Sequence, residues 1–432
     1  MSSLWPSAGV PLVAVVLVAV WCSSSRQVAR ARSSYPGAFL AIEREVQARR
    51  ANATPTWNFE AWADGFVRQK PLDRLPFTPT LTCEPLLSLL MDRFDWQLVP
   101  ASGWSRKRGC GKVDSLPWSN RTRTGDPKTV WAAPHALPRL LAAAARSFDP
   151  RRADRVVVFS GTEMPLSRAF GKSEAERNAT VRQLRKYFAR IVYQAKDIDL
   201  PHVHLAPHGL CWGCMYAVLG ELLGIWMSNS TRGQRAFAEL LGGFSAGLSG
   251  KTRGVLASKS GKPGWLEDPG TLRHVRALEA AGGLFPPSNS SPRSVAAAWE
   301  SRRRLQGWLG TPAARELAVE HRQLGPVEWW RELSTYRFLL APMGSGIQTA
   351  KPIDALLVLT VPIVQRMAFP TYDELMRMGF PIVVVTAWAE VTRSSTIEWW
   401  RRLAPRLEAF RRNCLTIDGY WRMYTGLASH CA

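Results

Sequence analysis

The feature that most limits the fold of this chain is a repeated alternation of apolar, β-branched runs with helical segments. In the first half, such runs lie at 128–134, 154–161, 190–194 and 202–207. In the second half they lie at 253–258, 336–342, 361–365 and 381–385. Short apolar runs joined by helices indicate strands that pair in parallel. The pattern therefore predicts an α/β fold with two parallel sheets.

Helix signals between the strands support this prediction. Ser173 is followed three residues later by Glu176, which is the spacing of a capping box. Val181, Leu184 and Phe188 then recur at helical spacing. We therefore predict a crossover helix that begins after Ser173.

The length of the chain indicates more than one domain. It has 432 residues, which is more than one hydrophobic core usually organises. A Gly- and Ser-rich stretch, LGGFSAGLSGK, lies near residue 250 between the two series of strands. We predict a first α/β domain at 35–250, a second at 251–432, and a targeting segment with a short stem at 1–34.

The first residues have the character of a targeting segment. Residues 9–22 form a continuous apolar run, and Arg26 is the first charged residue. The run suits the core of a signal peptide, and the uncharged window 4–25 is about long enough to cross a bilayer. Both interpretations place the remaining chain in the secretory lumen. We expect a single-pass membrane protein, in the Golgi or another compartment of that pathway, or a secreted protein if the segment is cleaved.

Asparagine and cysteine usage indicates the same compartment. Five of the seven Asn stand in N-x-[ST] sequons: Asn52, Asn120, Asn178, Asn229 and Asn289. About one was expected by chance, so we predict a glycoprotein. Six cysteines follow the apolar run, an even number that suggests disulfides without defining their connectivity. Cys211 and Cys214 have redox spacing but do not open a thioredoxin-like unit, which favours a local bridge or buried thiols.

The chain is strongly basic. It has 56 Lys and Arg against 34 Asp and Glu, a net charge of +22. In a nuclear protein this would suggest nucleic acid, but in a secretory compartment we expect acidic glycans, nucleotide-linked substrates or a membrane surface instead. Because the basic residues are scattered along the sequence, a solvated surface is the alternative explanation.

The loop after the run 336–342 has the composition of an anion-binding loop. Gly344 and Gly346 let main-chain N–H groups approach an anion, and the start of the next helix adds partial positive charge. Lys351 adds a full charge, and Asp354 could accept hydrogen bonds from a ribose. We therefore predict a nucleoside diphosphate site. An ordinary glycine turn beside a surface lysine is the alternative, since the spacing matches no standard phosphate motif.

These residues resemble the C-terminal half of the exostosin-type glycosyltransferases. That family has a strand ending in Pro-x-Gly, a basic residue, an acidic residue before Ala or Ser, and a Val-Pro-(Ile/Val)-(Ile/Val) strand. This chain has Pro342-Met343-Gly344, Lys351, Asp354-Ala355 and Val361-Pro362-Ile363-Val364. The similarity covers about 336–400 and is fainter over 128–260. The family commonly has Arg where this chain has Lys351, and frequently has Glu where it has Asp354; Lys lacks the bidentate phosphate geometry of Arg.

The resemblance implies a GT-B fold, in which two Rossmann-like domains face each other across a cleft. It implies a nucleotide-sugar donor, a UDP-sugar in particular, and transfer with inversion to a glycan or glycoprotein. Lys351 would contact phosphate and Asp354 the ribose. The other donor-site residues that it implies are Gly344, Ser345, Gly346, Gln365 and Arg366. We identify no Asp-x-Asp metal motif in the sequence, so we predict no obligatory metal ion and no cofactor beyond the nucleotide sugar.

An inverting transfer needs a general base from the facing domain, at the carboxyl end of a strand. Glu163, His208 and His135 each follow a predicted strand of the first domain. We favour Glu163 over His208 as the catalytic base. The structural alternatives are an acid at a helix N-terminus for Glu163 and a turn histidine for His208.

The sequence therefore predicts a glycosyltransferase of the secretory pathway. The alternative from a different class is a non-catalytic lumenal protein that binds glycans and keeps the fold. A sulfotransferase would share the compartment and the charge, but it needs a phosphosulfate loop after the first strand, and WAAPHALPRL does not supply one.

Overall fold

The computed structural model describes most of the chain after residue 124. The described residues are 93–98, 125–160, 164–209, 247–258, 273, 277, 292–344 and 346–431. The chain divides into two compact units, Met1–Trp62 and Ala63–Ala432, and all described residues belong to the second. The predicted targeting segment lies outside the described residues. In the ranges that are described, no helix has both the length and the apolar character needed to cross a membrane.

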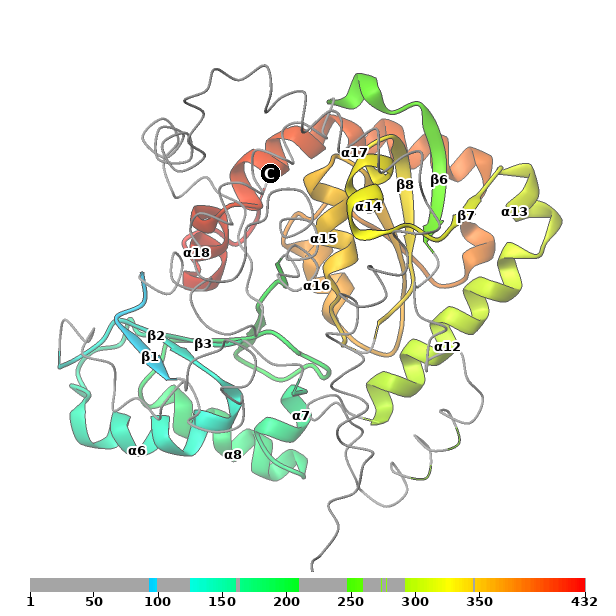
Figure 1. Cartoon of the computed structure of the whole chain (residues 1–432). Helices are drawn as coiled ribbons and strands as arrows, with labels where there is room; N and C mark the ends of the chain where they lie inside the picture. The colour runs from blue at the N-terminus through cyan, green and yellow to red at the C-terminus, as the bar shows by residue number, and fades with distance from the viewer. Residues whose placement is uncertain are drawn as a thin grey trace, which may run out of the picture. The chain divides into compact units, whose positions relative to one another are not determined.

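The first sheet has five parallel strands that lie side by side in chain order. They are β1 (Trp96–Leu98), β2 (Thr129–Ala132), β3 (Val156–Phe159), β4 (Arg190–Tyr193) and β5 (Val203–Leu205). The helices between them are α6 (Leu137–Ser147), α7 (Leu166–Ala169) and α8 (Glu174–Arg185). Figure 1 shows these helices along one side of the sheet. Right-handed crossovers that all step in the same direction give this placement.

The crossover helix predicted after Ser173 is confirmed as α8. The Oγ of Ser173 accepts from the main-chain N of Glu176 at 3.2 Å, and the Glu176 carboxylate accepts from the main-chain N of Ser173 at 3.4 Å. These two bonds form the capping box and satisfy donors that the first turn leaves open. Val181 and Leu184 are buried in the core between α8 and the first sheet.

The second sheet also has five parallel strands, but their order departs from chain order. The strands are β6 (Arg253–Ser258), β7 (Glu320–Arg322), β8 (Tyr336–Ala341), β9 (Val361–Gln365) and β10 (Val383–Val385). Across the sheet they run β10-β9-β8-β6-β7. The chain therefore leaves β6 toward one edge and leaves β8 toward the other.

The helices that accompany the second sheet have between 5 and 22 residues. They are α12 (Pro292–Leu309), α13 (Pro312–Glu316), α14 (Pro326–Leu333), α15 (Ala350–Leu357), α16 (Thr371–Arg377), α17 (Arg393–Cys414) and α18 (Ile417–Thr425). Three short 3-10 turns complete the elements: η4 (Pro134–Ala136), η5 (Leu248–Gly250) and η6 (Trp388–Glu390). The predicted α/β fold with two parallel sheets is confirmed. All eight predicted strands are present, and β1 and β7 were not predicted.

The Gly- and Ser-rich stretch near residue 250 ends in a buried lysine. Lys251 follows η5 with 3% of its surface exposed. Its Nζ donates to the main-chain O of Val358 at 2.6 Å and to Oγ1 of Thr360 at 2.8 Å. Burial lowers the pKa of Lys251 to about 7. The lysine therefore satisfies a carbonyl at the C-terminal end of α15.

In the wild type we expect the folding stability to increase as the pH rises above 7. Replacing Lys251 with Met should remove this increase. In the unfolded chain the lysine keeps its ordinary pKa of 10.5. Between pH 7 and pH 10 the unfolded chain therefore binds more protons than the folded one, and stability increases with pH. From pH 7 to pH 9, we expect the wild type to gain about 2 kcal/mol relative to Lys251→Met in chemical denaturation. The exposed Lys172→Met variant is the control; equal slopes for Lys251→Met and the wild type would contradict a buried amine.

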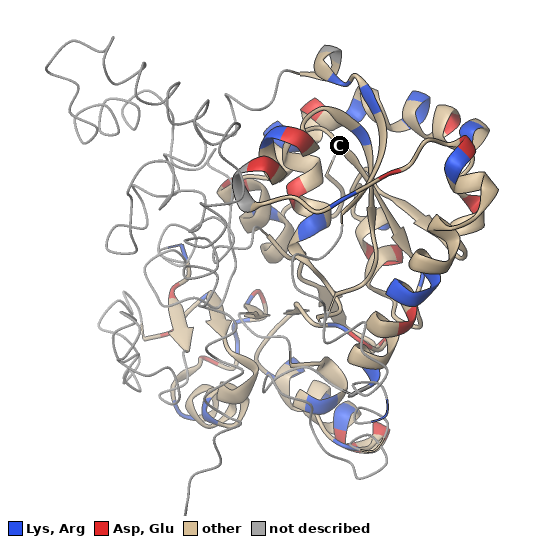
Figure 2. Ribbon diagram, turned by 45° about the vertical axis from the view of Figure 1, so that its right-hand side comes forward, with Lys and Arg blue, Asp and Glu red and all other residues tan. Residues whose placement is uncertain are grey.

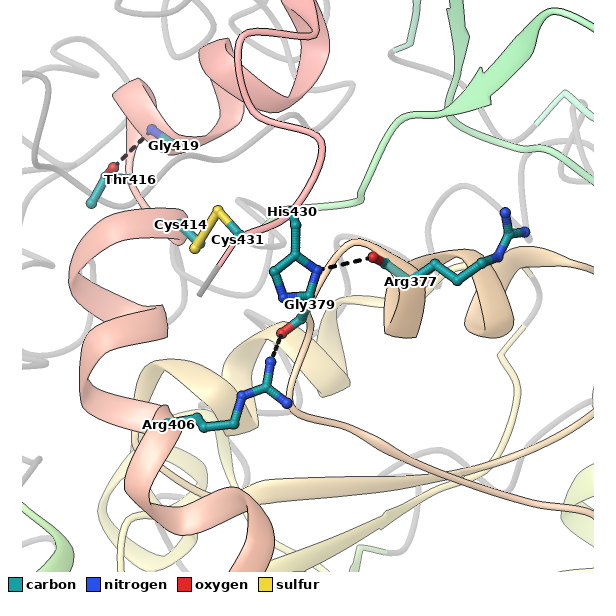
Figure 3. The surroundings of a disulfide bond; sticks show 8 residues. All are labelled: Arg377, Gly379, Arg406, Cys414, Thr416, Gly419, His430 and Cys431. Carbon is teal, nitrogen blue, oxygen red and sulfur yellow. Dashed lines mark hydrogen bonds between the residues drawn. A yellow bond between two sulfur atoms is a disulfide. The ribbon is translucent and has the colours of Figure 1, made fainter.

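A disulfide fixes the end of the chain, as Figure 3 shows. Cys414 at the end of α17 is bonded to Cys431, with the two Cα atoms 5.9 Å apart. The main-chain N of Cys431 also donates to the O of Met378 at 2.8 Å, and Nδ1 of His430 lies 3.1 Å from the O of Arg377. The last residues are therefore held by α17 and by the turn after α16. The other five cysteines lie outside the described residues.

The basic residues of the described ranges are distributed rather than gathered. Figure 2 shows Lys and Arg on many helices of both sheets, with Asp and Glu between them. Several belong to ion pairs at the surface, such as Arg303 and Arg304 with Glu300 on α12. The distribution agrees with the scatter of basic residues along the sequence.

Candidate nucleotide-binding site at the end of β8

The predicted anion-binding loop lies at a topological switch point of the second sheet. Residues 342–349, which we call the donor loop, leave the carboxyl end of β8 and enter α15. β8 and β6 are neighbours, but the chain continues from them in opposite directions across the sheet. In open α/β sheets, ligands bind outside the carboxyl ends of the strands at this kind of position. The topology therefore places the donor loop where a ligand site is expected.

Packing against α12 shapes the start of the donor loop. The main-chain N of Met343 donates to Oγ of Ser301 at 3.2 Å, and Nε of Arg302 donates to the Met343 carbonyl at 3.3 Å. A Cβ added at Gly344 would run into the side chain of Thr349. Glycine is therefore needed at this position so that the loop can fold back on itself, in addition to any approach of an anion.

Three consecutive residues later in the donor loop are covered by protein. Gly346, Ile347 and Gln348 are buried, while Ser345 lies outside the described residues. Thr349 is the N-cap of α15, and its side chain makes no capping bond. The start of α15 carries the partial positive charge of a helix N-terminus, which favours an anion.

Lys351 lies in the first turn of α15 above an aromatic ring. Its Nζ is 5.6 Å from the ring centroid of Trp329 on α14, which is a cation–π distance. The lysine is half-buried. It therefore adds positive charge beside the start of the helix, as its predicted phosphate role requires.

Asp354 is buried one turn further along α15. Only 5% of its surface is exposed. Its Oδ2 accepts from Nε1 of Trp329 at 3.2 Å, and its Oδ1 is buried without a hydrogen-bond partner in the described structure. Burial raises the pKa of Asp354 to about 7, against the opposing effects of the Trp329 N–H group and the Lys351 charge. Because Oδ1 is covered, a ribose hydroxyl would reach it only after local movement.

Gln365 and Arg366 differ in their surroundings. Gln365 ends β9 and is buried; its Nε2 donates to the O of Thr386 at 3.2 Å, and its Oε1 is buried without a partner in the described structure. The guanidinium of Arg366 is about half-exposed and donates to Asp373 at 2.7 Å. The first two elements after the donor loop, α15 and β9, thus each hold a buried carboxylate or amide oxygen without a donor, on Asp354 and on Gln365.

The donor loop contacts the carboxyl ends of two strands of the first sheet through Gln348. Its Nε2 donates to the main-chain O of Gln194, just after β4, at 2.6 Å, and to that of Ala206, just after β5, at 2.9 Å. Its Oε1 accepts from the main-chain N of His208 at 2.8 Å. The structure therefore brings a predicted catalytic residue and the predicted donor loop together.

His208 has the protonation state of a base. Its Nδ1 lies 2.6 Å from the carbonyl O of Gly209. Because a carbonyl only accepts, Nδ1 carries the proton and Nε2 has a lone pair. Burial lowers the pKa of His208, which keeps the ring neutral at pH 7. Glu163, the favoured base, lies outside the described residues, and His135 is exposed on η4.

Further hydrogen bonds and an ion pair join the two sheets. The Nζ of Lys196, three residues after β4, pairs with the carboxylate of Glu374 on α16, and both side chains are almost fully buried. Further bonds include those from Thr371 Oγ1 to Lys196 O at 3.0 Å, from Tyr420 OH to His208 O at 2.7 Å and from Tyr424 OH to Pro207 O at 2.9 Å. The carboxyl ends of β4 and β5 are therefore held by groups from α16, α18 and the donor loop.

An Asp-x-Asp sequence does occur at Asp197–Asp199, after β4. Asp197 is buried and accepts from the main-chain N and the Oγ of Ser167, while Asp199 pairs with Lys196. The two carboxylates thus serve different partners. In the part of the chain that is described, no three His, Cys, Asp or Glu residues gather as a metal site would require. Independence from metal ions stays a prediction.

Comparison with known proteins does not define a family for this chain. No protein-family model and no curated protein matches it. Among solved structures, a sucrose-phosphate synthase from Thermosynechococcus elongatus matches with 12% sequence identity and a TM-score of 0.27, over 70% of each chain. A function therefore has to be argued from the residues and their geometry.

Proposed function

We propose that this protein is a glycosyltransferase of GT-B type, which transfers a sugar from a nucleotide-sugar donor to a glycan or glycoprotein. The observation that carries the proposal is the bonding of Gln348, which joins a loop at a switch point of one sheet to the carboxyl ends of strands in the other. The donor loop of the second sheet, proposed to bind the nucleotide sugar, then contacts the strand ends of the first sheet, proposed to bind the acceptor. The sequence resemblance to exostosin-type enzymes supports a UDP-sugar donor and inversion.

In the proposed reaction, Nε2 of His208 takes the proton from an acceptor hydroxyl. The hydroxyl oxygen attacks the anomeric carbon of the sugar from the side opposite the leaving group. The bond between that carbon and the phosphate oxygen breaks, and the nucleoside diphosphate leaves. Lys351 and the first N–H groups of α15 stabilise the negative charge on its phosphates. Glu163 is the alternative base.

Nucleotide binding tests the proposal directly. We expect UDP or a UDP-sugar to raise the melting temperature of the full-length protein, since a ligand bound only by the folded form stabilises it. Removing one charged contact to phosphate in Lys351→Ala should weaken binding by about 10- to 100-fold, from roughly 1.5–3 kcal/mol. Lys351→Arg keeps the charge and should retain most of the affinity. Absence of stabilisation by any UDP- or GDP-sugar would contradict a donor site here.

One observation favours the second candidate, a lumenal glycan-binding protein without turnover. Gly346, Ile347 and Gln348 are buried, and Oδ1 of Asp354 is covered, so these groups are not open to a ligand in this conformation. A protein that had lost catalysis would keep these groups covered. Binding of an acidic glycan by the wild type, with neither UDP binding nor sugar transfer, would favour this candidate.

We propose the secretory pathway as the compartment. The disulfide between Cys414 and Cys431 supports it, because disulfides persist in oxidising environments. The excess of sequons supports it as well. A shift in electrophoretic mobility on treatment with an N-glycosidase is the expected result for the protein from cells, and an unchanged mobility would count against it.

A further inference from the structure

We propose that Gln348 is a positioning residue that fixes His208 relative to the donor loop. Binding of a nucleotide at the donor site would then change the position and surroundings of the His208 ring. This inference rests on the proposed function, because it takes residues 342–349 as the donor side and His208 as the base. It goes beyond that function by assigning a coupling role to Gln348, whose side-chain bonds are to the main chain of the segments after β4 and β5.

The side-chain amide of Gln348 makes three hydrogen bonds. Both hydrogens of its Nε2 are donated to carbonyls, those of Gln194 and Ala206, and its Oε1 accepts from the N–H group of His208. The side chain has 8% of its surface exposed. If this buried amide left its site, the carbonyls of Gln194 and Ala206 and the N–H group of His208 would each lose a hydrogen-bond partner. Gln348 therefore ties the loop to the ends of β4 and β5.

Three hydrogen bonds hold His208 in place, two at its main chain and one at its ring. Gln348 accepts from its main-chain N, the hydroxyl of Tyr420 donates to its main-chain O at 2.7 Å, and the carbonyl of Gly209 accepts from its Nδ1. Two of these three partners belong to the protein around the second sheet, Gln348 on the donor loop and Tyr420 on α18. The orientation of the ring, and with it the direction of Nε2, thus depends on where the donor loop lies.

Two influences set the pKa of His208, so a measured change in that pKa can be interpreted. The influences on its pKa are burial, which lowers it, and the Gly209 carbonyl, which raises it. Within the described residues, Tyr420 on α18 is a titratable side chain that bonds to His208, and burial holds the pKa of Tyr420 well above its ordinary value. Tyr420 therefore stays neutral while the histidine titrates. A change in the pKa of His208 then reports a change in its burial.

Nuclear magnetic resonance of the histidine rings in the full-length protein tests the proposal. The chain has seven histidines, and the signal of His208 is assigned by its loss in His208→Asn. In the wild type we expect this signal to titrate below pH 6.5 and to shift when UDP is added. In Gln348→Ala the pKa should move up toward 6.5, and UDP should no longer shift the signal although it still raises the melting temperature. Gln348→Met, closer to glutamine in volume, replaces this variant if it does not fold.

Gln194→Ala is the matched control. It also removes a buried glutamine side chain, whose Oε1 accepts from Oγ of Ser160 at 2.6 Å, but it keeps the main-chain carbonyl that Gln348 uses. We expect it to lose stability while His208 keeps the titration and the UDP response of the wild type. A turnover assay adds a second measurement: Gln348→Ala should lower kcat by about 10-fold or more with little change in KM for the donor, as expected when orientation of the base is lost.

The outcomes separate the two proposals. If UDP binds but His208 keeps its wild-type pKa and response in Gln348→Ala, the positioning role is wrong while the proposed function stands. If no nucleotide binds the wild type, the proposed function fails. The titration then still decides the structural half of the inference, since an unchanged pKa in Gln348→Ala overturns it.

Discussion

Replacing Asp354 with Asn is expected to stabilise the protein above pH 7 and to weaken nucleotide binding. Both effects have the same cause, a buried carboxylate with one oxygen that lacks a hydrogen-bond donor. Its pKa is about 7 in the folded protein and 3.8 in the unfolded chain. Between pH 4 and pH 7 the folded state binds more protons, so stability is highest at low pH and falls as the pH rises through 7. Because asparagine does not titrate, the Asp354→Asn variant does not lose this stability as the pH rises.

The size of the gain follows from the shift of the pKa. About three pKa units correspond to at most about 4 kcal/mol above pH 7. We expect on the order of 2 kcal/mol, because the new amide brings N–H groups that also need acceptors. This corresponds to a rise in apparent melting temperature of about 4–8 °C at pH 8 and none at pH 5. Calorimetry at the two pH values measures it.

The functional half of the prediction uses the same variant. If Asp354 accepts a ribose hydroxyl, Asp354→Asn should weaken UDP binding by about 10- to 100-fold, the loss expected for a hydrogen bond to a charged group. Trp329→Phe is the complementary change: it keeps a ring beneath Lys351 and removes the N–H group that lowers the pKa of Asp354. It should destabilise the protein at pH 8. A variant Asp354→Asn that is less stable than the wild type at every pH would show that the carboxylate is structural.

Most strands could be predicted because parallel strands buried on both faces give continuous apolar runs. β6 and β9 occupy the predicted 253–258 and 361–365. β7 could not be predicted, since Glu-His-Arg at 320–322 is a half-buried edge strand that pairs only with β6. Yet β7 creates the switch point between β6 and β8. The switch point at the candidate site therefore depends on an element that the sequence does not indicate.

The sequence also predicts only part of the candidate site. The loop, Lys351 and Asp354 were predicted from the strand–loop–helix pattern, but the burial of Asp354 was not. A signal for it exists, because five other residues from 352 to 357 in α15 are apolar and buried, and a helix that is apolar all round lies inside the protein. No signal exists for Gln348. Its acceptors are main-chain carbonyls 154 and 142 residues away, and a carbonyl carries no residue identity.

Replacing Lys196 with Met is expected to cause the largest loss of stability. Only 4% of the lysine side chain and 9% of the Glu374 side chain are exposed, and their ion pair joins the loop after β4 to α16. The change leaves the Glu374 carboxylate buried without its cation. Breaking a buried pair in this way costs about 3–5 kcal/mol. We expect the melting temperature to fall by roughly 10 °C, measured by calorimetry.

The double variant Lys196→Met with Glu374→Met separates the loss of the pair from the burial of one unpaired charge. A buried pair replaced by apolar residues of similar volume is often neutral, so the double variant should recover most of the stability. Lys128→Met is the matched control: its pair with Asp154 is exposed, at 59% and 53%, and should be worth about 1 kcal/mol or less. If both lysine variants lose equally little, the Lys196–Glu374 pair does not hold the two sheets together, and the position of His208 beside the donor loop would rest on Gln348, Tyr420 and Tyr424.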